Sequence, residues 1–461
     1  MTRTDKIINT SFEITREYLD NLRSTIENKD EVTARKVLDN LHAADIAEIY
    51  KALSADEAKY LYLLLDGEKA ADVLSSLEED ERDQFLKVLP SKIIAQQFIE
   101  HMDSDDAADI IADLSEEKKE EVLSYMEDVV QAGDIVDLLK YDENTAGGLM
   151  AKELISVNEN WDINTCLKEM RKQAEDVDEI YYVYVIDDDQ KLKGTLSLKK
   201  MLLRSNTSKV KNIYNKDIIA VKTDASSEEV ANIMDKYDLV SLPVIDSIGR
   251  LVGRITIDDV VDFIREEAEK DYQMISGITE DVETTDKVFL LTRARLPWLA
   301  IGMIGGIFSA KVISMYESDL RIYPEMAFFI PLITAMGGNV GVQSSSIIVQ
   351  SIANKTLGYI SPMKKLLKEL MVALTNGLIL CSLIFAYNYF FGDSLALTFT
   401  VSIALFSVII FASVFGTFIP LTLHKIKIDP ALATGPFITT SNDIIGLVIY
   451  LLIGRALHGI F

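Results

Sequence analysis

Five long runs of apolar residues occupy the second half of the chain. They cover residues 297–316, 326–352, 370–391, 395–423 and 430–454. A helix that crosses a bilayer needs about 20 consecutive, mostly apolar residues, and a water-soluble core rarely contains five such runs with so few charges. The pattern therefore predicts a membrane domain with five transmembrane helices.

The basic residues between these runs predict how the domain is oriented, because Lys and Arg are enriched in short cytosolic loops. Arg293 and Arg295 precede the first run, four lysines lie between the second and third, and Lys425 and Lys427 lie between the fourth and fifth. All of these loops fall on one side of the bilayer. We therefore expect a multi-pass protein of the cell membrane, with its N-terminal part in the cytosol and its C-terminus outside.

The first part of the chain has a different, helical pattern. Between residues 10 and 130, apolar residues recur at helical spacing and short polar segments interrupt them. Three similar phrases, HAADIAEIYKAL, EKAADVLSSL and SDDAADIIADL, begin at residues 42, 68 and 104. Repetition of this kind is typical of stacked helix pairs. We expect an all-α helical-repeat domain over residues 1–135.

A second kind of repeat lies within residues 136–264. The sequence Val185-Ile186-Asp187 recurs as Val244-Ile245-Asp246, an offset of 59 residues, and Gly194 matches Gly253 at the same offset. Each copy reads as an apolar strand, a turn, a second strand around the glycine, and then a helix. The pattern predicts an α/β tandem pair whose two copies stack on each other.

An acidic segment connects this repeat to the first apolar run. Residues 258–286 contain eleven acidic side chains and only two basic ones. The segment should be mostly helical, and we expect a connecting helix over residues 265–290. An acidic helix that leads directly into a membrane domain is suited to act as a gate.

Composition and charge agree with this division. The 461 residues include 46 Lys and Arg and 72 Asp and Glu, a net charge of −26, although 49% of the residues are hydrophobic. Residues 286–461 hold 12 basic and 8 acidic side chains, net +4, which leaves 34 basic and 64 acidic, net −30, for residues 1–285. Residues 1–285 are so acidic that they offer no basic face to a nucleic acid, which argues against a nucleic-acid-binding protein.

Other residue types exclude further classes of protein. Two cysteines in different halves and four scattered histidines argue against a disulfide scaffold and against a transition-metal cluster. The N-terminus has no apolar core of the signal-peptide type. We find no nucleophile–base pair and no phosphate-binding loop, so the sequence does not predict an enzyme.

The second apolar run is rich in residues that are unusual in a membrane helix. It contains Pro331, the sequence Gly337-Gly338-Asn339, Gly341, Gln343 and three serines. Proline and glycine can loosen the helical hydrogen-bond ladder, so that carbonyl groups point sideways where protein or a wet cavity covers them. Small residues can instead serve close helix packing. The sequence leaves both interpretations open.

The fifth run contains one charged residue between residues 430 and 454, Asp443. A carboxylate at membrane depth is costly and is a functional candidate by default. Asn442, Thr439 and Thr440 add oxygen atoms nearby. A protonated Asp443 bonded to a neighbouring helix is the structural alternative. A proton relay needs a second buried carboxylate or histidine, and we expect none in these runs.

Carboxylate, amide and hydroxyl oxygens suit hard cations. Mg²⁺ keeps several of its waters and needs only one or two carboxylates, whereas Ca²⁺ usually recruits more oxygen ligands. A hydrated Mg²⁺ ion that passes Asp443 is therefore plausible, and Mn²⁺ or Co²⁺ remain possible on chemistry alone.

At this point the sequence resembles the MgtE family of magnesium channels. The resemblance rests on six motifs: TAGGLM (145–150), IYYVYVID (180–187), KYDLVSLPVID (236–246), GRLVGRITIDDV (249–260), GGNVGVQS (337–344) and DPALATGPFITTSND (429–443). It implies a multidomain membrane protein. Its parts would be a helical N-domain (1–135), tandem CBS domains (136–264), a plug helix (265–290) and a five-helix transmembrane domain (291–461).

The resemblance also implies functional residues. A homodimer in the lipid bilayer would conduct Mg²⁺ through a central pore lined by the second and fifth spans, with a pore site at Asp443, Asn339, Gly338 and Asn442. Cytosolic Mg²⁺ would bind regulatory acids at the seams between domains. Motif by motif these are Asp105, Asp109, Glu228, Asp235, Asp238, Asp259, Asp262, Glu267 and Asp271. CBS pairs often bind adenosine nucleotides, so ATP is a possible further ligand.

These expectations combine into one mechanism. At low cytosolic Mg²⁺ the acidic domains repel one another and the gate is free, and at high Mg²⁺ bridging ions dock the plug helices and close the pore. Three alternatives remain: an ion-coupled transporter, a broader divalent-cation transporter that carries Co²⁺ or Mn²⁺, and a membrane-anchored Mg²⁺ sensor.

Overall fold

The computed structural model describes residues 14–458 except 78, 88, 175–176, 178–179, 280–281, 283–286, 354–361, 393 and 434. It divides into two compact units, Met1–Ile264 and Arg265–Phe461, and each is described here by itself. The expected acids at 280, 281, 283 and 286 lie outside the described residues, and so do residues 1–13, where the sequence predicts no signal peptide.

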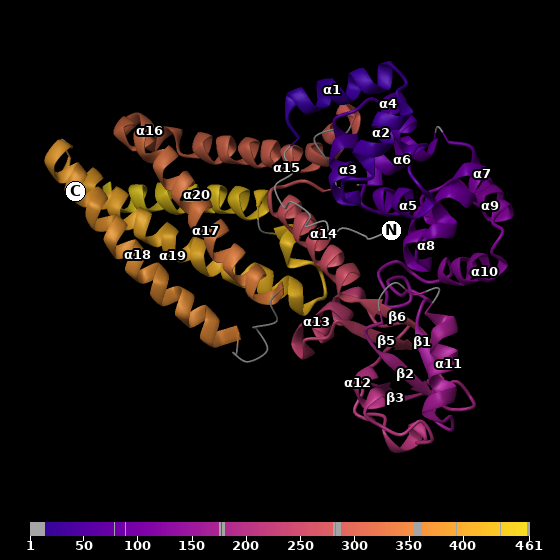
Figure 1. Ribbon diagram of the computed structural model, residues 1–461. Helices are drawn as coiled ribbons and strands as arrows, with labels where there is room; N and C mark the ends of the chain where they lie inside the picture. Colours follow the sequence, from indigo (N-terminus) through magenta and orange to yellow (C-terminus); the bar gives the residue numbers. More distant parts are fainter. Residues whose placement is uncertain are drawn as a thin grey trace. The chain divides into compact units, whose positions relative to one another are not determined.

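The first unit begins with a succession of short helices (Figure 1). Polar caps such as Ser54, which accepts from the backbone of Glu57 while Glu57 bonds back to Ser54, separate one helix from the next. Their apolar faces meet in one core, where the ring of Tyr62 stacks on Phe85 at 4.2 Å and meets the edge of Phe98. The helical repeat expected from the sequence is present. Its elements are α1 (Arg16–Glu27), α2 (Glu31–Leu38), α3 (Ala43–Lys51), α4 (Ala55–Tyr62), α5 (Gly67–Ser75), α6 (Glu79–Lys87), α7 (Ser91–Ile93), η1 (Ile94–Phe98), η2 (Ile99–His101), α8 (Ser104–Ala112), α9 (Glu116–Tyr125) and α10 (Val129–Leu138).

Two small sheets follow, one for each copy of the 59-residue repeat. In each sheet the first strand pairs parallel with the second, and the second pairs antiparallel with the third. The register shifts between Val185 and Ile186 in one sheet and between Val244 and Ile245 in the other, which is the same offset of 59. The elements are β1 (Ile155–Asn158), α11 (Ile163–Gln173), β2 (Val183–Ile186), β3 (Leu192–Leu196), α12 (Leu198–Leu202) and η3 (Val210–Asn212), then β4 (Val221–Lys222), α13 (Ser227–Tyr237), β5 (Ser241–Ile245), β6 (Leu251–Thr256) and α14 (Ile257–Ile275).

The two copies pack against each other as the repeat predicts. The N–H of Leu192 donates to the carbonyl of Gly249 at 3.1 Å, and the N–H of Leu251 donates to the carbonyl of Gln190 at 3.0 Å. The offset of 59 exchanges the donors and the acceptors of these two bonds, so an approximate twofold axis relates the copies. Helix α14 begins at Ile257, eight residues before the plug segment expected from the sequence.

Hydrogen bonds and an ion pair join the helical part to the first copy of the repeat. The Ser104 hydroxyl, at the start of α8, donates to a carboxylate oxygen of Glu153 at 2.7 Å and accepts from the N–H of Lys152 at 2.8 Å. The ammonium group of Lys152 lies 2.7 Å from Asp137 of α10. The orientation of α8, which carries three of the acids discussed below, is therefore held by partly buried hydrogen bonds.

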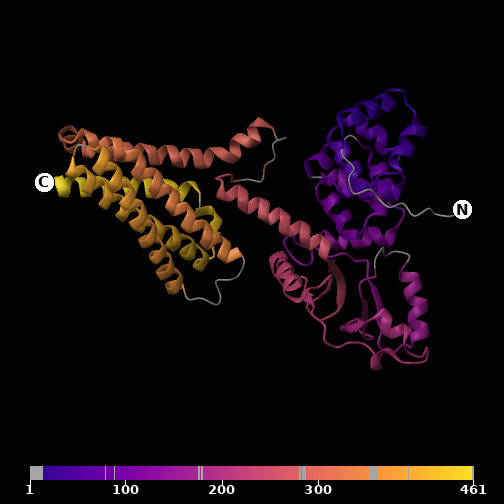
Figure 2. The ribbon, with the colours of Figure 1, turned by 60° about the vertical axis from the view of Figure 1, so that its left-hand side comes forward.

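The described part of the second unit contains five helices long and apolar enough to cross a membrane. They are α15 (Val288–Met315), α17 (Ile330–Ala353) with the 3₁₀ turn η4 (Pro324–Phe329) before it, α18 (Pro362–Phe391), α19 (Leu395–Lys425) and α20 (Pro436–His458); α16 (Glu317–Ile322) and η6 (Pro430–Ala433) are short connections. They lie side by side, with α19 the most buried and packed against α17, α18 and α20 (Figures 1 and 2). The expectation of five spans is met, although α15 begins nine residues before the first apolar run.

The structure decides between the two interpretations of the second span. Helix α17 is continuous from Ile330 to Ala353, so Pro331 and the glycines do not loosen its ladder. Pro331 stands in the first turn, where a missing N–H costs little. The glycines serve packing instead, because a methyl group on Gly416 of α19 would overlap the carbonyl of Gly341. Backbones that approach this closely need small residues at the crossing.

Candidate functional site

The candidate pore site lies where α17 crosses α20. A Cβ atom at Gly338 would lie 3.3 Å from a carboxylate oxygen of Asp443 and 3.1 Å from the methyl group of Thr439. The carboxylate therefore rests directly on the backbone of α17, with no side chain between. Asn339, the next residue of α17, is exposed at the surface of the unit. Three residues predicted to bind the ion, Asp443, Gly338 and Asn339, are thus brought to one crossing.

Asn442 occupies the other side of the same crossing. It is 1% exposed, and within the described part of the chain neither atom of its amide has a hydrogen-bond partner. Its amide nitrogen lies against Gly341, whose Cβ would overlap it. A buried amide without partners is costly and marks a place for water or an ion. Because Asn442 is enclosed and Asn339 is exposed, the two amides do not reach the same space.

Replacing Gly341 with alanine tests this close contact. The added methyl group would overlap the Asn442 amide, which lies between two helix backbones and has little room to move. We expect the variant to be destabilised by about 1–3 kcal/mol, the usual cost of overpacking. The measurement is thermal unfolding in detergent. Gly306→Ala is the matched control, because nothing lies within 4 Å of the Cβ that it would add; equal midpoints for the two variants would contradict the contact.

A second carboxylate lies inside the helical bundle, contrary to the expectation that the spans contain none. Glu369 belongs to α18 and is half-buried. Its Oε1 atom accepts a hydrogen bond from the hydroxyl of Ser344 on α17 at 2.7 Å and from that of Ser413 on α19 at 3.2 Å. The two hydroxyls are 3.1 Å apart. The apolar run begins at Leu370, one residue after Glu369. Helix α18 itself begins at Pro362 and therefore includes this glutamate.

In the first unit, two of the predicted regulatory acids face each other. Desolvation first, and then the charges of Asp259, Asp106 and Asp103, raise the pKa of Asp105 well above its ordinary value. Desolvation and the neighbouring Asp258 raise the pKa of Asp259 to about 6, although hydrogen bonds from Thr256 act in the opposite direction. Both side chains are half-buried. This seam between α8 and α14 therefore concentrates negative charge.

The surroundings of this pair are also mainly acidic. Asp106, which the sequence analysis did not single out, has a raised pKa because of desolvation and, among the charges, because of Asp258 and Asp262; Arg82 acts in the opposite direction. Asp109 lies one turn further along α8 and remains exposed at the surface. Its pKa is raised in the same direction, first by desolvation and then by Asp106.

The remaining predicted acids do not join this cluster. Glu228 and Asp235 lie seven residues apart on α13, roughly 10 Å along the helix, and Asp238 is its left-handed C-cap, with φ of 51°. Glu267 and Asp271 lie on the second half of α14. In the part of the chain that the structure describes, no three His, Cys, Asp or Glu side chains gather closely enough to hold a metal ion.

Comparisons with known proteins agree with this organisation. The model of the MgtE divalent cation transporter matches residues 330–453, that of the MgtE intracellular N domain matches 41–144, and the CBS domain model matches 146–205 and 210–266. The chain is 33% identical to the magnesium transporter MgtE of Thermus thermophilus over 443 aligned residues. The alignment covers 95% of this chain and 97% of the relative. The MgtE of Enterococcus faecalis is 34% identical over 93% of this chain and 94% of its own length.

The chain belongs to the MgtE family. As a member of this transporter family it is not an enzyme, and the two copies of the 59-residue repeat are CBS domains. A crystal structure of the cytosolic domain of the Mg²⁺ channel MgtE in complex with ATP is similar as well. It is 33% identical, covers 53% of this chain and 99% of the solved chain, and gives a TM-score of 0.50.

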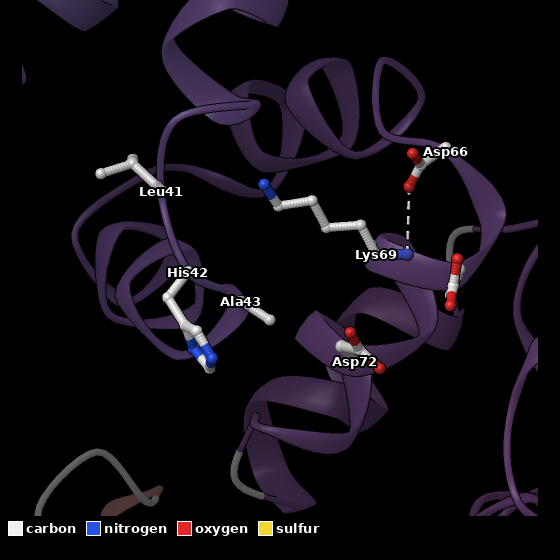
Figure 3. Close-up of a pocket in the computed structure, with 7 residues that line it drawn as sticks. Leu41, His42, Ala43, Asp66, Lys69 and Asp72 are labelled. Atoms are coloured by element: carbon white, nitrogen blue, oxygen red, sulfur yellow. Dashed lines mark hydrogen bonds between the residues drawn. The ribbon is translucent and has the colours of Figure 1, made fainter. Parts of the chain in front are cut away.

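Figure 3 shows a hollow in the MgtE N-domain that is separate from the sites above. It has a volume of about 300 Å³ and lies between the start of α3 and α5, with Leu41, His42, Ala43, Asp66, Glu68, Lys69 and Asp72 around it. The ammonium group of Lys69 donates to the carbonyl of Leu38 at 2.7 Å, which ties α5 to the end of α2. None of the predicted site residues lines this hollow.

Proposed function

We propose that this MgtE protein conducts Mg²⁺ into the cell through a pore that passes Asp443, and that cytosolic Mg²⁺ closes this pore. The observation that carries the proposal is the crossing of α17 and α20, where the Asp443 carboxylate lies against Gly338. Next to it, Asn339 and Gln343 are exposed on α17. Exposed amides on a membrane helix are poorly solvated by lipid, so this face suits a water-filled passage.

The ligand chemistry of the crossing fits Mg²⁺. One carboxylate, with the exposed amide of Asn339 on the facing helix, would hold an ion that keeps most of its own waters. An inside-negative potential of 100 mV drives a divalent cation inward by roughly 4.6 kcal/mol, twice the figure for a single charge. The relatives named as magnesium transporters support the choice of this ion.

We propose further that the pore forms between two copies of the chain. The polar face of α17 needs water or protein opposite it, and a second copy placed around a twofold axis would supply the same face. Each copy would contribute one Asp443. The N-terminal domains would lie in the cytosol and the C-terminus outside, because most of the lysines and arginines that flank the spans fall on one side.

The proposed gate acts through α14 and the start of α20. The carbonyl of Ile275, the last residue of α14, lies against Gly435, and Gly277 lies against Pro436. A movement of α14 would therefore press directly on the helix that carries Asp443. Mg²⁺ ions bound between Asp105 and Asp259, and at the other predicted regulatory acids, would fix α14 in the closed arrangement.

The CBS pair offers a second regulatory ligand. We propose that ATP binds there and changes the Mg²⁺ concentration at which the pore closes, a proposal that the ATP complex of the related cytosolic domain supports. Titration of the purified protein with ATP in a calorimeter, with and without Mg²⁺, tests it. An absence of binding heat under both conditions would leave Mg²⁺ as the sole regulator.

Ion flux into vesicles tests the transport proposal directly. Purified protein is reconstituted, and the entry of Mg²⁺, Mn²⁺, Co²⁺ and Ca²⁺ is compared under an inside-negative potential. We expect Mg²⁺ to enter without any coupling ion and Ca²⁺ to enter at least about tenfold more slowly, since a site with one carboxylate suits the smaller ion. Dependence on a proton or sodium gradient would favour ion-coupled transport, and the absence of flux would favour a sensor.

A further inference from the structure

The cluster of Glu369, Ser344 and Ser413 is not explained by either the pore site or the regulatory acids. It joins three helices, because Glu369 lies on α18, Ser344 on α17 and Ser413 on α19. Ser344 is 3% exposed and Ser413 is 1% exposed. Within the described part of the chain Glu369 makes no ion pair, and it accepts hydrogen bonds from these two hydroxyls alone.

Hydrogen bonds gain strength in apolar surroundings, where a buried donor that loses its acceptor is costly. Two buried hydroxyls that both donate to one carboxylate oxygen therefore form a strong and directional link between helices. If Glu369 moved away while the helices stayed in place, the two buried hydroxyls would lose this acceptor, and their contact with each other could satisfy only one of them. The cluster thus resists any sliding or rotation of α17 relative to α18 and α19.

The position of Ser344 on α17 connects this link to the pore site. Gly338 faces Asp443, Gly341 faces Gly416 and Asn442, and Ser344 faces Glu369 and Ser413. These three residues are spaced by three along one helix, so each is rotated by about 60° from the one before. The contacts of α17 accordingly pass from α20 to α19 and then to α18. The cluster therefore fixes α17 less than two turns after the residue that touches Asp443.

We propose that Glu369 is a positioning residue for the pore: it fixes the rotation of α17 and hence the place of Gly338 and Asn339 opposite Asp443. This inference rests on the proposed function, since it assigns Glu369 a role in conduction through that crossing. Glu369 does not touch the ion. It acts through Ser344, and its contribution depends on the acceptor oxygen rather than on the negative charge.

The test compares substitutions that separate the acceptor from the charge. Glu369→Ala removes both, whereas Glu369→Gln keeps an oxygen that can accept from Ser344 and Ser413. We expect Glu369→Ala to raise the Mg²⁺ concentration for half-maximal flux by roughly tenfold, the scale of leaving buried hydroxyls without their acceptor, and to change the ratio of Mg²⁺ to Co²⁺ flux. Glu369→Gln should recover most of the wild-type value, and Ser344→Ala with Ser413→Ala should resemble Glu369→Ala.

Two serines provide matched controls. The hydroxyls of Ser382 on α18 and Ser407 on α19 bond only to carbonyls of their own helices, at 2.7 Å and 2.8 Å. Ser382→Ala and Ser407→Ala should leave both the half-maximal concentration and the flux ratio unchanged. A purely structural role for Glu369 would lower the flux of every ion in proportion to the amount of folded protein, with the ratio unaltered.

The outcomes distinguish this inference from the proposed function. If the wild-type protein carries no Mg²⁺, the proposed function fails. If the wild type conducts and Glu369→Gln behaves like Glu369→Ala, the charge itself is required, and Glu369 is an ion site or a proton relay rather than a positioning residue. If Glu369→Ala conducts like the wild type, with unchanged selectivity, the cluster has no part in conduction.

Discussion

Replacing Asp443 with alanine or asparagine is expected to reduce Mg²⁺ flux by at least about a hundredfold, which corresponds to roughly 2.7 kcal/mol. Asp443 is the only charged residue that the last span carries between residues 430 and 454. Its carboxylate lies against the backbone at Gly338, so no other side chain on α17 can take its place there. Asparagine has nearly the same shape as aspartate but no charge. The loss of flux in Asp443→Asn therefore measures the contribution of the negative charge.

The size of this effect follows from the charge of the ion. A hydrated Mg²⁺ that leaves bulk water for a narrow passage loses part of its outer hydration, and one fixed negative charge offsets that loss. At a separation of about 5 Å and an effective dielectric constant of about 20, a charge product of two corresponds to several kcal/mol. Amide and carbonyl dipoles at the crossing supply only part of this attraction. A pore without the carboxylate should therefore bind the ion too weakly to conduct.

Flux into vesicles under a fixed potential provides the measurement, supported by rescue of a bacterial strain that lacks its own Mg²⁺ uptake. Glu317→Gln is the control, because Glu317 is exposed and pairs only with Arg321, at 2.7 Å. Asp443→Glu keeps the charge and should retain measurable flux. Wild-type flux in Asp443→Asn would show that the ion passes elsewhere and would remove the main support for the proposed pore.

Much of this architecture can be predicted from the sequence, because it depends on local patterns. Five apolar runs of sufficient length give five membrane helices, and the offset of 59 residues gives two sheets with the same order and the same irregularity. Asp443 stands out for the same reason, since a single charge in an apolar run is visible without any knowledge of its neighbours. Each of these signals lies within one helix or one repeat.

The features that the sequence did not reveal depend on partners far apart in the chain. Glu369 meets Ser344 across 25 residues and Ser413 across 44 residues. Its own surroundings, after Lys364, Lys365 and Lys368, resemble an ordinary loop. Three serines in the second span were a sign that a polar partner was near, but their spacing does not say on which helix it lies.

The glycines of the second span show a related limit. Composition alone allows either a loosened helix or a close crossing, since both need small residues. The choice is made by α19, where Gly416 leaves room for the backbone of Gly341. A glycine on the partner helix shows that the small residues of α17 serve a close crossing rather than a loosened helix. Only the three-dimensional arrangement identifies that partner helix.

The acids of the first unit lead to the second large expected effect, which concerns closure of the pore. Helical spacing places Asp105 and Asp109 on one face of α8, but it does not show that Asp259 lies opposite Asp105. With that pairing, Asp105→Asn should raise the cytosolic Mg²⁺ concentration for half-closure by at least about fivefold, the lower range of typical coupling between sites. The variant loses a ligand for the ion and also a source of repulsion, and these two effects oppose each other.

The charges decide which effect is larger. Attraction between Mg²⁺ and a carboxylate has twice the charge product of the repulsion between two carboxylates, and the ion lies closer to each oxygen than the oxygens lie to each other. Loss of the ligand therefore dominates in Asp105→Asn. In Asp105→Lys a fixed positive charge faces Asp259 instead. Docking then no longer needs the ion, and the open probability without Mg²⁺ should fall by at least about fivefold.

Recordings from excised patches, with Mg²⁺ varied on the cytosolic face, separate these expectations. Asp39→Lys is the control, because it makes the same change of charge at an exposed position at the end of α2. A mechanism based on the total charge of the domain predicts equal effects at positions 39 and 105, whereas a bridge between α8 and α14 predicts an effect at position 105 alone. If both lysine variants close the pore equally, the net charge of −30 acts as a diffuse field. If only Asp105→Lys does so, the closing ion has a defined place beside Asp259.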